Sequence, residues 1–460
     1  MKFDGSIIEE EFYKKYNNAK VKYVTSNKTY IIKATKPSRY VPYDIALSVA
    51  NKTIAIIEFK SRRYIDVFDY SRILKYASEN NIRLIILSDG EKFIVTDRKN
   101  PNLKATYNFD EILTLFEKKL EINVEDAKTN IANLFKEIIS QSEFIFLKES
   151  IENMHSRIIS GLEFDEIEQT FSFKNSTDIN NIENRIFRLL LKDDKPLTKV
   201  YRYTTLSTIY SMLNHNSFRM NCLVGMNDTT EVNYAENYIT GTNKDYTQAP
   251  WQTVDAYNKR FISSCSLKDD DLTQWRLYAD DSKGVCLVLN VNVEQLNSKF
   301  VLKRISYSKK DCTHPELDLI KKIIATLKDT LHVDFVFKTL STWRHFFKPY
   351  DYAVEEEVRL LFVSHEDSFK KGWLLTASHN ILNPYVEFKL NDNDLPLQLS
   401  EVVFGPKCPE KEINLKQFEQ FTRELRKKKK SITLNGRVNE MDEYNIPKLT
   451  YSLSKIKNYR

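Results

Sequence analysis

Residues 42–60 read PYDIALSVANKTIAIIEFK, and this stretch sets the expected fold of the first part of the chain. Two apolar runs flank Asn51, a residue that favours tight turns, so we expect two antiparallel strands joined there. Side chains alternate between the two faces of a strand, which places Glu58 and Lys60 on the same face. Together with Asp44 on the preceding strand, they supply the two carboxylates and the ammonium group that metal-assisted phosphodiester hydrolysis uses.

The length of the turn decides whether Asp44 joins the other two residues. A three-residue turn centred on Asn51 places Asp44 opposite Glu58, and this is the turn we expect. A two-residue turn at Asn51 and Lys52 would instead place Asp44 opposite Phe59, on the wrong face. A shared acidic site therefore requires a turn of odd length or a β-bulge. The alternative is a surface hairpin with ordinary solvated charges.

Further elements follow in an order that supports the first interpretation. A helix is expected around residues 70–77, and a strand reading IRLIILSD follows it. Asp89-Gly90 then separates this strand from a second apolar run, KFIVTD, which is a strong hairpin signal. The first 100 residues thus read as a helix, strands, an acid-bearing strand, an ExK strand, a helix and a final hairpin.

This order and its D…ExK residues resemble the PD-(D/E)xK nuclease superfamily, in particular the nuclease domain at the start of type I restriction subunits. The resemblance implies a restriction-endonuclease-like mixed sheet flanked by helices, and Mg²⁺-dependent cleavage of DNA. It implies that Asp44 and Glu58 hold the metal and that Lys60 is catalytic.

The same resemblance carries residues of two helices to the site. In relatives, a Gln or Tyr on the helix after the ExK strand approaches the metal, and here only Tyr76 or Arg72 is available. Tyr76 as core packing is the alternative. In relatives an acid of the first helix reaches the metal, and the resemblance gives that role here to Glu10 or Glu11. Solvation on the helix surface is the alternative for these acids.

The basic residues of the chain are concentrated in this segment. Residues 1–100 hold 19 Lys and Arg against 12 Asp and Glu, whereas the other 360 residues hold 50 and 51. A positive domain attracts phosphate backbones without reading their sequence. The candidate DNA-binding residues are Lys33, Lys36, Arg39, Arg62 and Arg63, and a solvated surface is the alternative for each.

Length and composition limit the remaining possibilities. A chain of 460 residues with 42% hydrophobic content is expected to form two or three domains, which we place at residues 1–105, 106–195 and 196–460. The middle segment reads as a helical connector. The polar start lacks the apolar run of a signal peptide, and no stretch is long enough to span a membrane, so we expect a cytoplasmic protein. Five scattered cysteines without a CxxC pair disfavour disulfides and zinc.

A second group of motifs begins at residue 199. The marks are YRYT with Arg202, Asn227-Asp228 with Glu231, SCS with Ser264 and Ser266, QWRLY with Arg276 and Tyr278, EEEVR with Glu355, Glu357 and Arg359, and FGPKC. Together they resemble a bacterial domain family of unknown function. We therefore expect an α+β domain at residues 196–460.

The order Arg…Ser-x-Ser…Glu-x-Glu is also similar to the ADP-ribosyltransferase superfamily. That similarity implies that Arg202 grips NAD, that Ser264 or Ser266 braces the ribose and that Glu357 is catalytic. The alternative is a structural role, in which Glu355, Glu357 and Arg359 form a buried charge network with Arg276.

The sequence as a whole predicts an α/β plus α+β protein that cleaves DNA with Mg²⁺, and the resemblance implies a bacterial antiviral defence effector. The C-terminal domain would sense or regulate, with an unidentified trigger molecule or protein as partner, and the chain could form a homo-oligomer. Two alternatives stay open: an ADP-ribosyltransferase toxin that uses NAD and binds nucleic acid through its N-terminal domain, and a non-enzymatic binding protein with two degenerate sites.

Overall fold

The computed structural model describes most of the chain and divides it into two compact units. It leaves out residues 1–4, 24–27, 39, 61–66, 81, 99, 116–122, 167, 175–180, 192–195, 224–230, 243–259, 297–298, 364–370, 376–381, 435–436, 443–445, 447 and 458–460. Unit 1 comprises Met1–Gln141, Lys148–Lys174 and Ile323–Phe337. Unit 2 comprises Ser142–Leu147, Asn175–Lys322 and Lys338–Arg460. The chain is a mixed α and β protein, as expected, but the segment expected as a separate connector contributes to both units.

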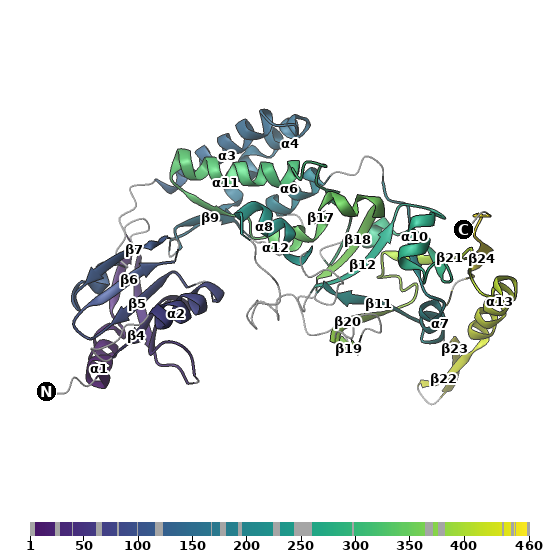
Figure 1. Ribbon diagram of the computed structural model, residues 1–460, viewed down its shortest axis with the longest axis horizontal. Coiled ribbons are helices and arrows are strands. Elements are labelled where there is room, and N and C mark those ends of the chain that lie inside the picture. The colour runs from purple at the N-terminus through teal and green to yellow at the C-terminus, as the bar shows by residue number, and fades with distance from the viewer. Residues whose placement is uncertain are drawn as a thin grey trace. The chain divides into compact units, whose positions relative to one another are not determined.

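Unit 1 is built on a mixed sheet whose seven described strands pair in chain order (Figure 1). Every neighbouring pair is antiparallel except β4 and β5, which run parallel and are connected through helix α2. The elements are α1 (Gly5–Tyr16), β1 (Lys20–Tyr23), β2 (Lys28–Thr35), β3 (Ile45–Val49), β4 (Lys52–Phe59), α2 (Val67–Glu79), β5 (Leu84–Ser88), β6 (Phe93–Asp97) and β7 (Asn100–Tyr107).

The two helices cover opposite faces of this sheet. Phe12 and Tyr16 of α1 pack in one apolar cluster with alternate residues of the strands, including Ile57. Ile73 of α2 packs in a second cluster with the residues between them, including Ile56. Because β4 is buried on both faces along its centre, its apolar run is continuous there, and polar residues appear only near its two ends.

The rest of unit 1 is less helical than expected. Helices α3 (Val124–Ser140), α4 (Lys148–Asn153) and α5 (His155–Gly161) occupy the expected helical region. The chain then forms strands β8 (Leu162–Asp165) and β9 (Thr170–Phe173), and β9 pairs in parallel with β16 (Asp334–Val336). The buried Phe171 and Phe173 stand two apart, a strand period that the expectation of a helical connector overlooked.

Unit 2 is built on a second large sheet. Its path is β19-β20-β11-β12-β10-β13-β21-β24, and β18 pairs with both β12 and β14. The strands are β10 (Lys199–Thr204), β11 (Ser217–Cys222), β12 (Arg260–Ser266), β13 (Val285–Val291), β14 (Phe300–Arg304), β18 (Glu357–Val363), β19 (Lys371–Leu375), β20 (Leu382–Lys389), β21 (Leu397–Phe404) and β24 (Thr450–Leu453).

Short helices and two small sheets complete unit 2. The helices are α6 (Ile182–Leu190), α7 (Leu206–Asn214), α8 (Tyr234–Thr240), α10 (Leu272–Tyr278), α12 (Leu340–Trp343) and α13 (Lys411–Lys427), with 3₁₀ helices at η4 (Glu231–Asn233), η6 (Val293–Gln295), η7 (Arg344–Phe346) and η8 (Tyr350–Glu355). Helix α11 (Pro315–Leu331) begins in unit 2 and ends in unit 1. The small sheets pair β15 (Ser306–Tyr307) with β17 (Phe347–Lys348) and β22 (Lys429–Leu434) with β23 (Arg437–Asp442). None of the described helices combines the length and the apolar character needed to cross a membrane.

Candidate functional site

The turn between β3 and β4 has two residues, so the expected three-residue turn is wrong. Ala50 and Asn51 both take left-handed backbone angles, with φ of 49° and 65°, and Val49 pairs with Lys52. Left-handed angles at both turn residues give the turn a twist that matches the right-handed twist of the two flanking strands. Continued without interruption, this register would set Asp44 opposite the apolar Ile57.

A register shift within the hairpin corrects this by one residue, in the manner of a β-bulge. Beyond it Ile45 pairs with Ile57, so Asp44, the residue before β3, comes beside the end of β4. The backbone N–H of Asp44 donates to the carbonyl oxygen of Ile57 at 2.8 Å. The Asp44 carboxylate accepts the N–H of Phe59 at 2.7 Å, which holds it between Glu58 and Lys60 along the chain.

Lys60 lies close to both acids. Its Nζ is 2.6 Å from Oε1 of Glu58. The pKa of the Asp44 carboxyl is raised above its ordinary value, mainly by burial and further by the charge of Glu9. The Phe59 N–H and the Lys60 charge act in the opposite direction and offset only part of this rise. The structure thus brings Asp44, Glu58 and Lys60 together where β4 ends.

Glu58 has one oxygen that no described group satisfies. Its side chain is only 6% exposed, and Oε1 takes the ion pairs with Lys60 and, at 3.0 Å, with Arg72. Oε2 is buried and has no hydrogen-bond partner among the described residues. Leaving a carboxylate oxygen buried and unpaired is unfavourable, so this atom is suited to receive a cation or a donor.

From helix α1, the charge of Glu9 raises the pKa of Asp44. Glu10 is more exposed and pairs with Lys36 at 2.9 Å and with Lys14 at 4.0 Å. Lys36 also pairs with Glu9 at 3.0 Å, so the two acids share this one lysine. The sequence had indicated Glu10 or Glu11 for this position.

From helix α2, Arg72 contacts the acidic site. Its guanidinium reaches Glu58 and also donates to the hydroxyl of Tyr40 at 3.2 Å. The ring of Tyr76 lies 5.4 Å from that of Tyr43 and packs against the apolar cluster beneath α2. Of the two residues the sequence offered on this helix, the structure places Arg72 in the position expected for a site residue.

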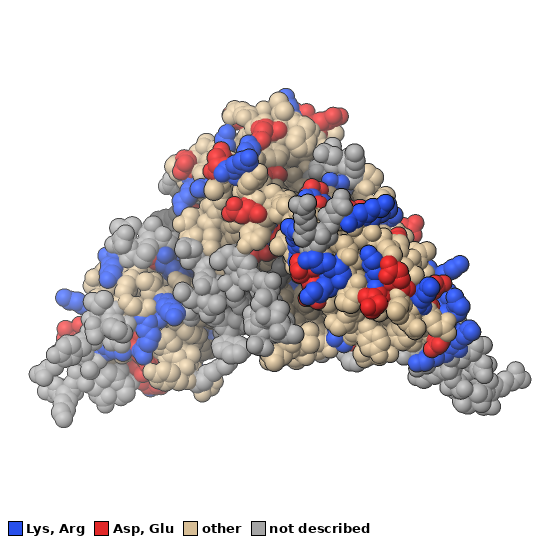
Figure 2. All heavy atoms as spheres, turned by 45° about the vertical axis from the view of Figure 1, so that its right-hand side comes forward, with Lys and Arg blue, Asp and Glu red and all other residues tan. Residues whose placement is uncertain are grey.

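The candidate DNA-binding residues are only partly described. Lys33 is exposed on β2, and Lys36 is occupied by Glu9 and Glu10. Arg39, Arg62 and Arg63 lie outside the described residues. On the face of the protein that Figure 2 shows, basic and acidic side chains are interspersed.

Two carboxylates are enough protein ligands for a magnesium site. Among the described residues no group of three or more His, Cys, Asp or Glu is placed to hold a metal ion. Mg²⁺ retains several waters and is often held by one or two carboxylates together with substrate phosphates, so a larger protein cage is not required. Asp44 and Glu58, with the unpartnered Oε2, therefore fit the ion that the nuclease resemblance implies.

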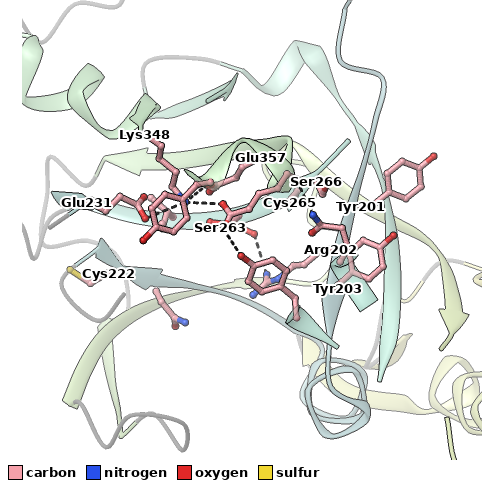
Figure 3. A pocket seen from close by; sticks show the side chains of 17 residues that line it. Tyr201, Arg202, Tyr203, Cys222, Glu231, Ser263, Cys265, Ser266, Lys348 and Glu357 are labelled. Carbon is pink, nitrogen blue, oxygen red and sulfur yellow. Dashed lines mark hydrogen bonds and ion pairs between the residues drawn. The ribbon is translucent and has the colours of Figure 1, made fainter. Parts of the chain in front are cut away.

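Unit 2 contains a pocket of about 470 Å³ in the surface of its large sheet (Figure 3). Residues of β10, β11 and β12 line it, together with residues of α10 and of the segment from Lys348 to Glu357. Glu231, Lys348 and Glu357 gather at one end, and Tyr201, Arg202 and Tyr203 of β10 stand at the other (Figure 3). Most of the second group of sequence candidates meet here, namely Arg202, Ser264, Ser266, Tyr278, Glu355 and Glu357.

The acidic end of the pocket is a buried charge network. Arg359 donates to Glu357 at 2.9 and 3.0 Å and pairs with Glu231. Lys348 lies 2.7 Å from Glu357, 3.0 Å from Glu355 and 3.2 Å from Glu231. Three carboxylates thus surround two cations, which leaves one negative charge in excess.

This network keeps Glu357 and Arg359 charged. Burial would raise the pKa of Glu357, but Arg359 and Lys348 outweigh it and hold that pKa at about 2. Burial would likewise lower the pKa of Arg359, but Glu357 and Glu231 raise it. Glu357 is therefore an ionised acid whose two oxygens are already occupied. The structure agrees with the expected strand-face pairing of Glu357 and Arg359, but places it beside a pocket.

Arg202, at the other end, has a different environment. Its NH1 donates to the hydroxyl of Ser263 at 3.1 Å, and its guanidinium carbon lies 5.4 Å from the centre of the Phe218 ring. Burial lowers its pKa. No described carboxylate forms an ion pair with it.

The remaining candidates have defined places. The hydroxyl of Ser266 donates to the backbone oxygen of Glu355 at 2.7 Å, and Ser264 hydrogen-bonds Glu357 and helps to lower its pKa. The hydroxyl of Tyr278 donates to the Glu355 carboxylate. Arg276 lies on the exposed side of α10 and does not line the pocket, so the expected network with Arg276 is replaced by one with Lys348.

Sequence reasoning missed Lys348 and Ser263 and did not assign Glu231 a role. A lysine within the apolar stretch FFKPY was a signal that could have been used, because a buried lysine needs acidic partners. Ser263 stands next to the predicted Ser264 and faces Arg202 instead. Asn227 and Asp228 lie outside the described residues.

The fold and pocket define a mixed α and β protein with a charged cavity in its second unit. Residues 274–360, which belong to unit 2 except for Ile323–Phe337, match the family model described as "Protein of unknown function (DUF2971)". No curated protein and no solved structure matches the chain. The matched stretch contains Tyr278, Lys348 and Glu357 of the pocket, and it includes no part of the D…ExK segment.

Proposed function

We propose that unit 1 is a Mg²⁺-dependent nuclease that cleaves DNA, and that unit 2 senses a signal and regulates the cleavage. The observation that carries this proposal is the convergence of Asp44, Glu58 and Lys60 at the end of β4, with one buried oxygen of Glu58 left without a partner among the described residues. The order α1, β1–β4, α2, β5, with β4 parallel to β5, is in keeping with a restriction-endonuclease-like core. A role in antiviral defence belongs to the same proposal and rests on the resemblance of the N-terminal segment.

The roles of the three residues follow from their chemistry. Asp44 and Glu58 would hold the ion, which supplies charge stabilisation at the scissile phosphate and a more acidic water. The Phe59 N–H keeps the Asp44 carboxylate oriented, and Lys60 offsets the charge of both acids. The Lys60 ammonium has three N–H donors and can also orient an attacking water or contact a phosphate oxygen.

Plasmid cleavage tests the proposal directly. The full-length protein should nick or linearise supercoiled DNA in Mg²⁺ and should be inactive in EDTA. Lys60→Met should abolish cleavage at every Mg²⁺ concentration, because the acids remain but the ammonium is lost. Cleavage that persists in EDTA, or that survives in Lys60→Met, would place any nuclease activity elsewhere.

Arg72 and Tyr76 give a second, smaller prediction. Arg72→Gln should slow cleavage by roughly tenfold, because it removes a charged hydrogen bond to Glu58 from a half-exposed residue. Tyr76→Phe should change the initial rate less than twofold, since its ring packing is retained. A larger effect from Tyr76→Phe than from Arg72→Gln would reverse this assignment.

The environment of Glu357 favours sensing over ADP-ribosyl transfer in unit 2. If unit 2 were an ADP-ribosyltransferase, Glu357 would stabilise a positively charged transition state of NAD. Both of its oxygens are already paired with Arg359 or Lys348, which leaves this acid poorly suited to that task. We therefore keep NAD chemistry as the alternative and expect no release of nicotinamide from NAD.

A further inference from the structure

Tyr40 is the one exposed tyrosine among the described tyrosines of unit 1. It is 91% exposed, whereas the others, such as Tyr16, Tyr43 and Tyr76, are buried or half-buried. At that exposure both faces of the aromatic ring are open to solvent. A tyrosine ring normally contributes by burying its large apolar surface, so a ring held open in this way is available to pack against a ligand.

A shared hydrogen-bond partner places this ring beside the candidate metal site. One nitrogen of Arg72 donates to the Tyr40 hydroxyl at 3.2 Å, and another donates to Oε1 of Glu58 at 3.0 Å. Both bonds come from one guanidinium, so the hydroxyl and the carboxylate lie within the reach of a single planar group. The Glu58 oxygen that has no described partner belongs to the same carboxylate. A group that packs on the Tyr40 ring is therefore close to an ion held by Glu58.

The backbone that carries Tyr40 leads directly into the site. Only three residues separate Tyr40 from Asp44. Between them, the ring of Tyr43 packs against the ring of Tyr76 at a distance of 5.4 Å. The backbone N–H of Asp44 is in turn bonded to a carbonyl oxygen of β4 at 2.8 Å. These contacts anchor the segment, so the exposed ring projects from a fixed base next to the acids.

We infer that Tyr40 stacks an unpaired base of single-stranded DNA, with a neighbouring phosphate at the ion held by Asp44 and Glu58. The inference rests on the proposed nuclease function and deepens it by naming the form of the substrate. Stacking on a side chain needs a base with a free face, whereas the bases inside a duplex are stacked on one another. The excess of 19 basic over 12 acidic residues in the first 100 residues supplies attraction to phosphates of any sequence.

Binding measurements with three labelled probes test the form of the substrate. Because the proposed cleavage requires Mg²⁺, fluorescence anisotropy of the full-length protein in EDTA measures binding alone. Single-stranded oligo(dT) should bind more tightly than an abasic strand of equal length, which has the same phosphates and no bases. It should also bind more tightly than a blunt duplex of that length. Equal affinities for oligo(dT) and the abasic strand, or tighter binding of the duplex, would overturn the inference.

Two variants of the same residue locate the stacking. Tyr40→Ala should weaken oligo(dT) binding by about 5- to 150-fold, the range for the loss of one stacked base. It should leave the affinity for the abasic strand unchanged. Tyr40→Phe is the matched control, because it keeps the ring and loses only the hydroxyl, and it should bind oligo(dT) as the parent does. Equal affinity of Tyr40→Ala and the parent for oligo(dT) would refute the stacking.

Cleavage assays separate this inference from the proposed function. In Mg²⁺, Tyr40→Ala should cleave a single-stranded oligonucleotide more slowly than the parent when the DNA is below saturation. If the parent cleaves DNA and Tyr40→Ala cleaves the single strand at the parental rate, the nuclease proposal stands and the stacking is wrong. If no DNA is cleaved but oligo(dT) binding depends on the Tyr40 ring, the nuclease assignment fails and the stacking is upheld.

Discussion

Glu58→Gln should reduce Mg²⁺-dependent DNA cleavage by on the order of 10³-fold or more, because residues that share one reaction centre act as a unit. Glutamine keeps the shape of the side chain and removes the charge that holds the ion. The buried Oε2, which has no described partner, is the atom whose loss matters most. Initial rates on supercoiled plasmid, measured over a series of Mg²⁺ concentrations, check this result.

Asp44→Asn should give a loss of similar size and the same dependence on the ion. If both acids bind the metal, high Mg²⁺ should restore part of the activity in each variant, in contrast to Lys60→Met. The control is Asp97→Asn on β6 of the same sheet, where the carboxylate pairs with Arg83 at 3.0 Å, away from the three residues. Asp97→Asn should cleave at the parental rate. Full activity in Glu58→Gln, in a protein with unchanged thermal stability, would refute the nuclease assignment.

The register of the β3–β4 hairpin could be predicted from the sequence only in part. Alternating apolar residues around Asn51 predicted both strands, and the spacing of Asp44 and Glu58 predicted that an odd turn or a bulge was needed. The structure uses a two-residue turn with a register shift. Nothing in the residues distinguishes the two solutions, because each leaves the same apolar set on the core face.

The pocket of unit 2 was predictable only in part. Glu357 and Arg359 are two apart on one strand, so their pairing followed from strand geometry. Lys348 and Glu231 come from distant segments, and only the packing of β17 and η4 near β18 brings them to the same point. Contacts between side chains far apart in sequence are fixed by tertiary packing and leave no local pattern.

Arg359→Met should lower the stability of unit 2 by about 3–5 kcal/mol, the range for breaking a buried ion pair by removing one partner. Arg359 is 1% exposed and holds Glu357 and Glu231, so its loss leaves three buried carboxylates around Lys348 alone. The melting temperature should fall by roughly 10 °C. The control is Arg423→Met on α13, whose pair with Glu419 is half exposed and should contribute less than about 1 kcal/mol.

The double variant and the pH dependence identify the cause of this loss. Arg359→Met combined with Glu357→Gln should lower the free energy of unfolding by less than the sum of the two single changes, because the unpaired charge is also removed. The pKa of Glu357 is lowered from its ordinary value of 4.5 to about 2 in the folded protein. Its contribution is therefore complete above pH 4.5 and is lost as the pH falls toward 2. In Arg359→Met that contribution should shrink, so the stability difference between variant and parent should narrow through this acid range. A difference that stays constant from pH 6 to pH 3 would mean that lost packing, and not the charge network, causes the destabilisation.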